Sequence, residues 1–151
     1  MDDVVAISGG HSWALSQRAK SITPEAPRAQ RDSITGQIIG AGIEVHRQLG
    51  PGLLESAYRE CLCWELNHRG LTIEREIALP LVYKGVHVDA GYRLDLIVEK
   101  RVLVELKAVE RLAPVHTAQV LTYLKLTGLR VGLLINFNAG VLRDGIVRLV
   151  L

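Results

Sequence analysis

Apolar residues recur at intervals of three and four along two consecutive segments of the chain, which is the spacing of helices that bury one face. The first segment covers residues 33–49 and ends at a Gly-Pro-Gly sequence at 50–52. The second covers residues 54–66 and is followed by Gly70, a residue suited to a left-handed helix stop. The pattern therefore predicts two helices before any strand.

Alternation of apolar and polar residues replaces the helical spacing after Gly70. Residues 71–83 carry apolar side chains on one parity, and Pro80 interrupts this extended stretch or confines it to a sheet edge. Further strands are expected over 92–98, 102–108, 131–137 and 145–151, and a helix over 114–126. The resulting order, ααβββαββ, predicts an α/β fold whose mixed sheet, largely antiparallel at its start, is flanked by helices.

The N-terminal residues differ from the rest of the chain. Residues 1–31 show no sustained period and include two prolines in SITPEAPRAQ, so we expect a loosely ordered leader before a single domain of residues 32–151. No apolar run approaches the roughly 20 residues that cross a bilayer, and the start of the chain lacks the pattern of a secretory signal. We therefore expect a cytoplasmic protein with no membrane partner.

The cysteine pattern excludes some kinds of site. Cys61 and Cys63 are the only cysteines, and side chains two apart on a helix point to different faces. This spacing suits neither a disulfide nor a zinc site, so we expect two small side chains in or near the core.

Charge is unevenly distributed along the chain. The formal net charge is +2, but residues 100–151 contain eight basic and three acidic residues. The last third of the chain is therefore a candidate surface for a polyanion.

The most informative stretch is the hairpin predicted around Lys100. One face carries only apolar residues: Leu94, Leu96, Val98, Val102, Val104 and Leu106. The other face carries Arg93, Asp95 and Ile97 on the first strand and Leu103, Glu105 and Lys107 on the second. If Lys100 is the centre of a three-residue loop, Asp95 lies directly across from Glu105, about 4.5 to 5.5 Å away.

Two opposed carboxylates on an interior pair of strands predict a cation between them, and magnesium-type ions take carboxylate oxygens. Lys107 projects from the same face, where an ammonium group can orient or deprotonate an activated water and offset charge on a phosphoryl oxygen. This is hydrolysis chemistry. The alternative interpretation is a cross-strand lattice of salt bridges on a wet face.

These residues resemble those of a known superfamily. Asp95 followed by Glu105-Leu106-Lys107 resembles the D…(D/E)-x-K core of the PD-(D/E)xK nucleases. The sequence GLLESAY at 52–58 matches the G-x-x-E-x-x-Y signature of one of its small bacterial families. The resemblance covers about residues 33–140 and implies a restriction-endonuclease-like core with Mg²⁺ or Mn²⁺ as cofactor.

The resemblance also implies roles for individual residues. Asp95 and Glu105 would bind the metal, with the Leu106 carbonyl as a third ligand and Lys107 as the catalytic base or electrostatic stabiliser. Glu55 would enter the site from the second helix, as a catalytic residue and metal ligand. Without the resemblance, a Glu in a first helical turn simply favours the positive end of the helix dipole.

A second group would supply a further ligand or support the site. His46 is a candidate metal ligand, and otherwise a core or boundary histidine. Gln119 and Tyr123 form a Q-x-x-x-Y element typical of exonuclease-type branches, although a rim Gln and a half-buried Tyr on an amphipathic helix explain them equally well. The remaining candidates for support or nucleic-acid contact are Tyr58, His116 and Arg93.

We therefore expect a metal-dependent nuclease that hydrolyses phosphodiester bonds of DNA or RNA with water as the nucleophile. The alternatives are a catalytically inactive nucleic-acid-binding or scaffolding module of the same fold and, third, a small-molecule hydrolase. The intact set of Asp95, Glu105 and Lys107 favours an enzyme. The sequence leaves open the type of nucleic acid, its strandedness, the mode of cutting, the pathway and whether the protein forms a homodimer.

Overall fold

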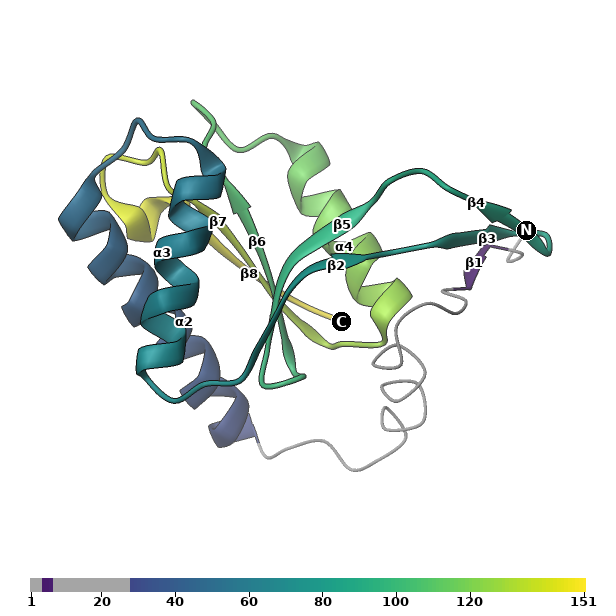
Figure 1. Cartoon of the computed structure of the whole chain (residues 1–151), viewed down its shortest axis with the longest axis horizontal. Coiled ribbons are helices and arrows are strands. Elements are labelled where there is room, and N and C mark those ends of the chain that lie inside the picture. Colours follow the sequence, from purple (N-terminus) through teal and green to yellow (C-terminus); the bar gives the residue numbers. More distant parts are fainter. Residues whose placement is uncertain (1–3, 7–27) are drawn as a thin grey trace.

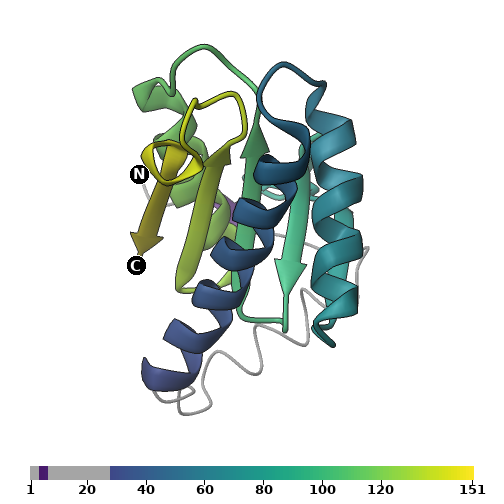
Figure 2. The same cartoon turned by 90° about the vertical axis from the view of Figure 1, so that its left-hand side faces the viewer.

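The computed structural model describes residues 4–6 and 28–151 and contains a five-stranded sheet between two helical layers. Helices α2 (Arg28–Leu49) and α3 (Glu55–His68) cover one face of the sheet, and α4 (Pro114–Thr127) covers the other (Figures 1 and 2). The predicted mixed α/β architecture is confirmed. Within the described part of the chain, no helix combines the length and the apolar character needed to cross a bilayer.

The central sheet is mixed. Its strands are β2 (Ile73–Ala78), β5 (Arg93–Val98), β6 (Val102–Lys107), β7 (Val131–Asn136) and β8 (Ile146–Val150), in the order β2-β5-β6-β7-β8. All neighbours are antiparallel except β6 and β7, which are parallel because the chain crosses over through α4. A short 3₁₀ helix, η1 (Leu142–Gly145), precedes β8.

A second, smaller sheet extends away from the layered core (Figure 1). It consists of β3 (Leu81–Tyr83), β4 (Val86–Val88) and β1 (Val4–Ala6), in the order β1-β3-β4. The break predicted at Pro80 is present, and a turn at Lys84-Gly85 follows β3. Residues 71–83 therefore form two strands that belong to different sheets, where the predicted element order counts one.

The prediction of a loosely ordered leader falls mostly on residues 1–3 and 7–27, which lie outside the described part of the chain. Within the leader, the backbone of Val4–Ala6 pairs with β3, and α2 already begins at Arg28. The division at residue 31 stays a prediction.

Two apolar clusters lie on opposite faces of the sheet. The cluster under α2 and α3 includes Leu96 and Val98, and the cluster under α4 includes Leu94 and Ile97. The predicted apolar face is therefore wrong at Leu94, which packs with α4. The reason is local: between the paired residues Arg75–Leu96 and Ile77–Leu94, Glu76 has φ = 49°, so the pleat of β2 and β5 is interrupted at Glu76 and Asp95.

The cysteines lie at the cluster under α2 and α3. Cys63 is buried within it, Cys61 packs against it, and both are free thiols, as the spacing predicts.

Candidate active site

The two predicted carboxylates face each other where strands β5 and β6 stop pairing through their backbones. The ladder runs from Val98–Val102 to Leu96–Val104, so the turn is centred on Lys100. Beyond it, the backbone N–H of Asp95 donates to Glu105 Oε1 at 3.0 Å, and that of Leu106 donates to Asp95 Oδ2 at 2.8 Å. Side-chain oxygens thus take the place of main-chain acceptors.

This environment is buried rather than wet. Asp95 is 9% exposed and Glu105 3%, because α4 covers the face that Ile97 and Leu103 share with Glu105. Burial and the neighbouring charge of Asp95 raise the pKa of Glu105 to about 9. The interpretation as a solvated salt-bridge lattice therefore does not fit, and the pair would be relieved by a cation.

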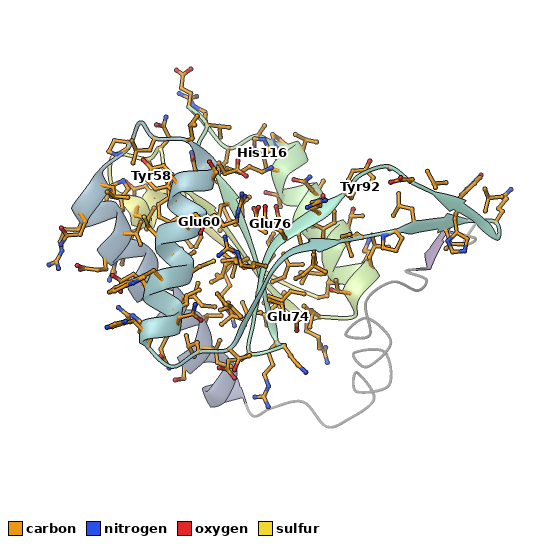
Figure 3. The ribbon with its side chains drawn as sticks, in the orientation of Figure 1. Tyr58, Glu60, Glu74, Glu76, Tyr92 and His116 are labelled. Carbon is orange, nitrogen blue, oxygen red and sulfur yellow. The ribbon has the colours of Figure 1, made fainter. Side chains whose placement is uncertain are left out.

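Arg59 and Glu76 belong to this site although sequence reasoning missed both. Arg59 Nη1 lies 3.2 Å from Asp95 Oδ1, and its Nη2 lies 3.3 Å from Glu76 Oε1. The Nε atom of Arg59 is buried and has no hydrogen-bond partner among the residues that the structure describes. Arg59 follows Glu55 by one helical turn, a spacing that could have indicated it. Glu76, labelled in Figure 3, carries no such signal because its position depends on strand pairing.

Glu55 is the first residue of α3 and lies close enough to the carboxylates to interact with them. Its pKa is raised by partial burial and by the charge of Asp95, while Lys107 and Arg59 act to lower it. The structure thus brings Glu55 into electrostatic contact with both ends of the D…E-x-K element.

Tyr58, also labelled in Figure 3, holds the segment that presents Glu55. Its hydroxyl donates to the Gly50 carbonyl at 2.5 Å and accepts the Leu53 N–H at 3.1 Å. Its buried ring stacks on Phe137 with centroids 4.6 Å apart. Tyr58 therefore supports the site through the backbone of the preceding loop.

Lys107 ends β6, and the chain beyond it is fixed by a residue that the sequence did not single out. Asn136 pairs with Lys107 in the parallel register, and its side chain accepts the Val109 N–H at 3.0 Å and donates to the Val109 carbonyl at 2.9 Å. Asn136 is buried. A polar residue that ends an otherwise apolar strand is the signal that could have identified it.

The Q-x-x-x-Y element lies on the other side of the carboxylates. Gln119 Nε2 donates to the Tyr123 hydroxyl at 2.9 Å. Tyr123 is buried, and burial together with the charge of Glu105 raises its pKa. The ring of Tyr92 meets the ring of Tyr123 edge-on, with centroids 6.4 Å apart. Helix α4 therefore contributes hydrogen-bonding groups beside Glu105.

Three predicted residues have other contacts. His46 Nε2 lies 2.7 Å from the Ala139 carbonyl, and Arg93 is exposed at the start of β5. His116 Nδ1 accepts the Ala113 N–H at 2.9 Å, so this residue closes the first turn of α4 (Figure 3). These hydrogen bonds of His46 and His116 are with backbone groups, of a distant segment for His46 and of its own helix start for His116, rather than with Asp95 or Glu105.

The donor set fits a hard divalent ion of limited protein coordination. No group of three or more His, Cys, Asp or Glu side chains in residues 33–151 is arranged to hold a metal. Asp95 and Glu105 supply two carboxylates, and the Leu106 carbonyl stays a predicted third oxygen. Magnesium is usually bound through one or two carboxylates and keeps several waters or substrate oxygens, so a site of this composition suits it.

Comparison with known proteins gives a match to a protein family. The family model described as "PD-(D/E)XK nuclease superfamily" matches residues 32–149, well over half of the chain and all of the elements that carry the site. No curated protein and no solved structure matches the chain.

Proposed function

The chain belongs to the PD-(D/E)XK nuclease superfamily, and we propose that it is a divalent-metal-dependent nuclease of the G-x-x-E-x-x-Y group. The observation that carries this proposal is the buried Asp95–Glu105 pair, whose carboxylates are fixed by backbone N–H groups of each other's strands. A pair of like charges in so dry a place is costly unless a cation joins it. We propose that cytoplasmic DNA or RNA is the substrate; a homodimer stays a prediction.

Asp95, Glu105 and the Leu106 carbonyl would hold Mg²⁺ or Mn²⁺. We leave His46 out of this set because its Nε2 is already bonded to the Ala139 carbonyl. When bound, the ion supplies Lewis-acid activation of water and neutralises charge on a phosphoryl oxygen.

The chain's own residues would complete the reaction. Lys107 Nζ would donate a hydrogen bond to the attacking water or to a phosphoryl oxygen. Glu55, whose pKa is raised by burial and by Asp95, would accept a proton from that water. The Tyr123 hydroxyl, held by Gln119, would orient the phosphate from the opposite side.

One observation favours the alternative of an inactive binding module. Arg59 already places a positive charge against Asp95, so part of the charge that a metal would neutralise is neutralised by the protein. In that case the fold could bind nucleic acid without turnover.

Cleavage assays distinguish the two functions. Single- and double-stranded DNA and RNA would be incubated with the full chain in Mg²⁺, in Mn²⁺ and in EDTA. We expect cleavage only with metal, and its loss in Lys107→Ala but not in Lys125→Ala, which removes an exposed lysine from α4. Nucleic-acid binding without metal-dependent cleavage would establish the binding module instead.

A further inference from the structure

Tyr92 is a large aromatic residue that the fold leaves 44% exposed, and its ring meets the ring of Tyr123. It precedes Asp95 by three residues, a distance of about 10 Å along an extended chain. Its carbonyl accepts the Leu79 N–H at 2.8 Å, which fixes the backbone between the small sheet and β5. The ring is therefore held at the edge of the site rather than on a free loop.

The contact between Tyr92 and Tyr123 leaves ring surface available. The two rings are inclined at 67°, with the edge of one directed at the other. Such a contact covers at most one face of Tyr92, and 44% of the residue is exposed to solvent. Tyr123 in turn lies within electrostatic reach of Glu105 and Asp95. An open aromatic face is thus connected to the carboxylates through a single intervening ring.

The surroundings of Tyr92 suit a polyanion that carries flat bases. Exposed Arg93 directly follows it. In the small sheet, at the turn between β3 and β4, Lys84 Nζ lies 5.5 Å from the ring centre of Tyr83, which is 53% exposed. Aromatic faces combined with cations bind single-stranded nucleic acids through base stacking and phosphate attraction. Inside a duplex the base faces are already stacked on one another, so away from the duplex ends an open ring can stack on a base only where a nucleotide is unpaired.

We propose that Tyr92 stacks on an unpaired base of the substrate beside the reacting phosphate, so that this nuclease acts on single-stranded nucleic acid or on an unpaired end. The inference rests on the proposed function, because it assigns the class of substrate to the same site. The small sheet then extends the binding surface, with Tyr83 and Lys84 as a second position for a base and a phosphate.

Binding measurements with the full chain test this assignment without requiring turnover. Fluorescence anisotropy in Ca²⁺ would compare a short single-stranded oligonucleotide with a blunt duplex of the same sequence. We expect tighter binding of the single strand, and about tenfold weaker binding of it by Tyr92→Leu with duplex binding unchanged. Tyr92→Phe, which keeps the ring, and Trp64→Leu, which removes an exposed aromatic residue from α3, should bind as the unmodified protein does.

A second readout reports stacking directly. An oligonucleotide with 2-aminopurine at successive positions should lose fluorescence at one position on binding to the unmodified protein and to Tyr92→Phe, but not to Tyr92→Leu. Equal affinity of Tyr92→Leu and the unmodified protein for the single strand, or equal quenching by both, overturns the inference. Failure of metal-dependent cleavage with intact Tyr92-dependent stacking overturns the proposed nuclease function alone.

Discussion

Glu105 Oε1 accepts the backbone N–H of Asp95 at 3.0 Å, so one carboxylate of the site fixes the main chain that carries the other. Asp95 in turn fixes the main chain next to Glu105, because its Oδ2 accepts the N–H of Leu106 at 2.8 Å. The two side chains therefore have a role in the fold in addition to the chemistry that we propose. Variants at these positions must separate the two roles.

Asp95→Asn should abolish cleavage and preserve the fold. The amide oxygen can still accept the Leu106 N–H, whereas the metal-binding charge is lost. Asp95→Ala would leave that buried N–H without an acceptor and cost about 1 to 3 kcal/mol of stability. Single-turnover cleavage in Mg²⁺ and urea unfolding check both statements.

Nucleic-acid binding should survive in Asp95→Asn, because one negative charge facing the polyanion is removed and the cationic surface remains. Binding in Ca²⁺ over a series of salt concentrations would measure this. Cleavage at the unmodified rate would show that the metal site is misplaced, and loss of folding would show that the carboxylate is structural.

The metal-free protein should lose stability as the pH rises. The pKa of Glu105 is raised from its ordinary value of 4.5 to about 9, so the folded protein binds this proton more tightly than the unfolded chain. By linkage, the stability that protonated Glu105 contributes to the folded state is present below about pH 4.5 and is lost progressively up to about pH 9. Thermal unfolding in EDTA at several pH values should show this decline.

Glu105→Gln should flatten the decline, because a neutral amide has no proton to lose. The exposed Glu110→Gln serves as the matched control and should leave the decline unchanged. Saturating Mg²⁺ should also reduce the decline of stability with pH in the unmodified protein, since the ion favours the ionised carboxylate. An identical pH dependence in Glu105→Gln and the unmodified protein would contradict the assignment.

Arg59→Gln should destabilise the protein more in EDTA than in Mg²⁺. Arg59 is largely buried and neutralises Asp95 and Glu76, and removal of one partner from such a pair costs about 3 kcal/mol. A bound divalent ion would replace part of that charge at Asp95. The measurement is urea unfolding with and without metal.

Arg75→Gln provides the comparison for Arg59, because Arg75 pairs with Glu60 on the exposed surface. Exposed pairs contribute about 0 to 1 kcal/mol, and this pair lies outside the carboxylate cluster. We expect a small effect that does not depend on metal. Equal losses for Arg59→Gln in EDTA and Mg²⁺ would exclude competition between Arg59 and the ion.

Alternation along the chain was sufficient to predict the hairpin, because its register depends on residues within one short segment. Symmetry about Lys100 places Asp95 opposite Glu105, and the ladder has that centre. The side of the sheet on which Leu94 packs could not be predicted, since it depends on the left-handed conformation of Glu76 in a different strand.

The same limit applies to the partners of the predicted site residues. Arg59 reaches Asp95 only because α3 packs on one face of the sheet, and Asn136 reaches Val109 across a parallel pair. These contacts join residues far apart in sequence. Periodicity reports which face a residue occupies within its own element, and tertiary packing decides what it meets there.

Tyr58→Phe should lower both stability and cleavage. The change removes a hydroxyl that joins Gly50 and Leu53, at a cost of about 1 to 2 kcal/mol, while the stack on Phe137 is kept. Loosening this loop would disturb Glu55, so the rate should fall with metal binding unchanged. Calorimetric titration with Mn²⁺ beside single-turnover cleavage would separate these effects.

Neutralising exposed cations at the end of β6 and β7 should weaken binding without changing the chemical step. Arg111 and Arg143 are exposed and follow these strands in sequence. Neutralising an arginine that binds a phosphate should reduce the slope of log affinity against log salt by about 1. Arg47→Gln, which removes an exposed cation from α2, is the matched control, and an unchanged slope in both the Arg111 and the Arg143 variant would place the polyanion elsewhere.

The bonds from Asp95 and Glu105 to backbone N–H groups also limit how this fold can lose catalysis during evolution. An apolar replacement at either position would leave a buried N–H without an acceptor, so a descendant that abandoned hydrolysis by that route would lose about 1 to 3 kcal/mol of stability. Replacement by Asn or Gln removes the charge and retains the acceptor. Among descendants that retain only binding, we therefore expect amides at these two positions, and such a pair would record former nucleases in sequences that no longer cut.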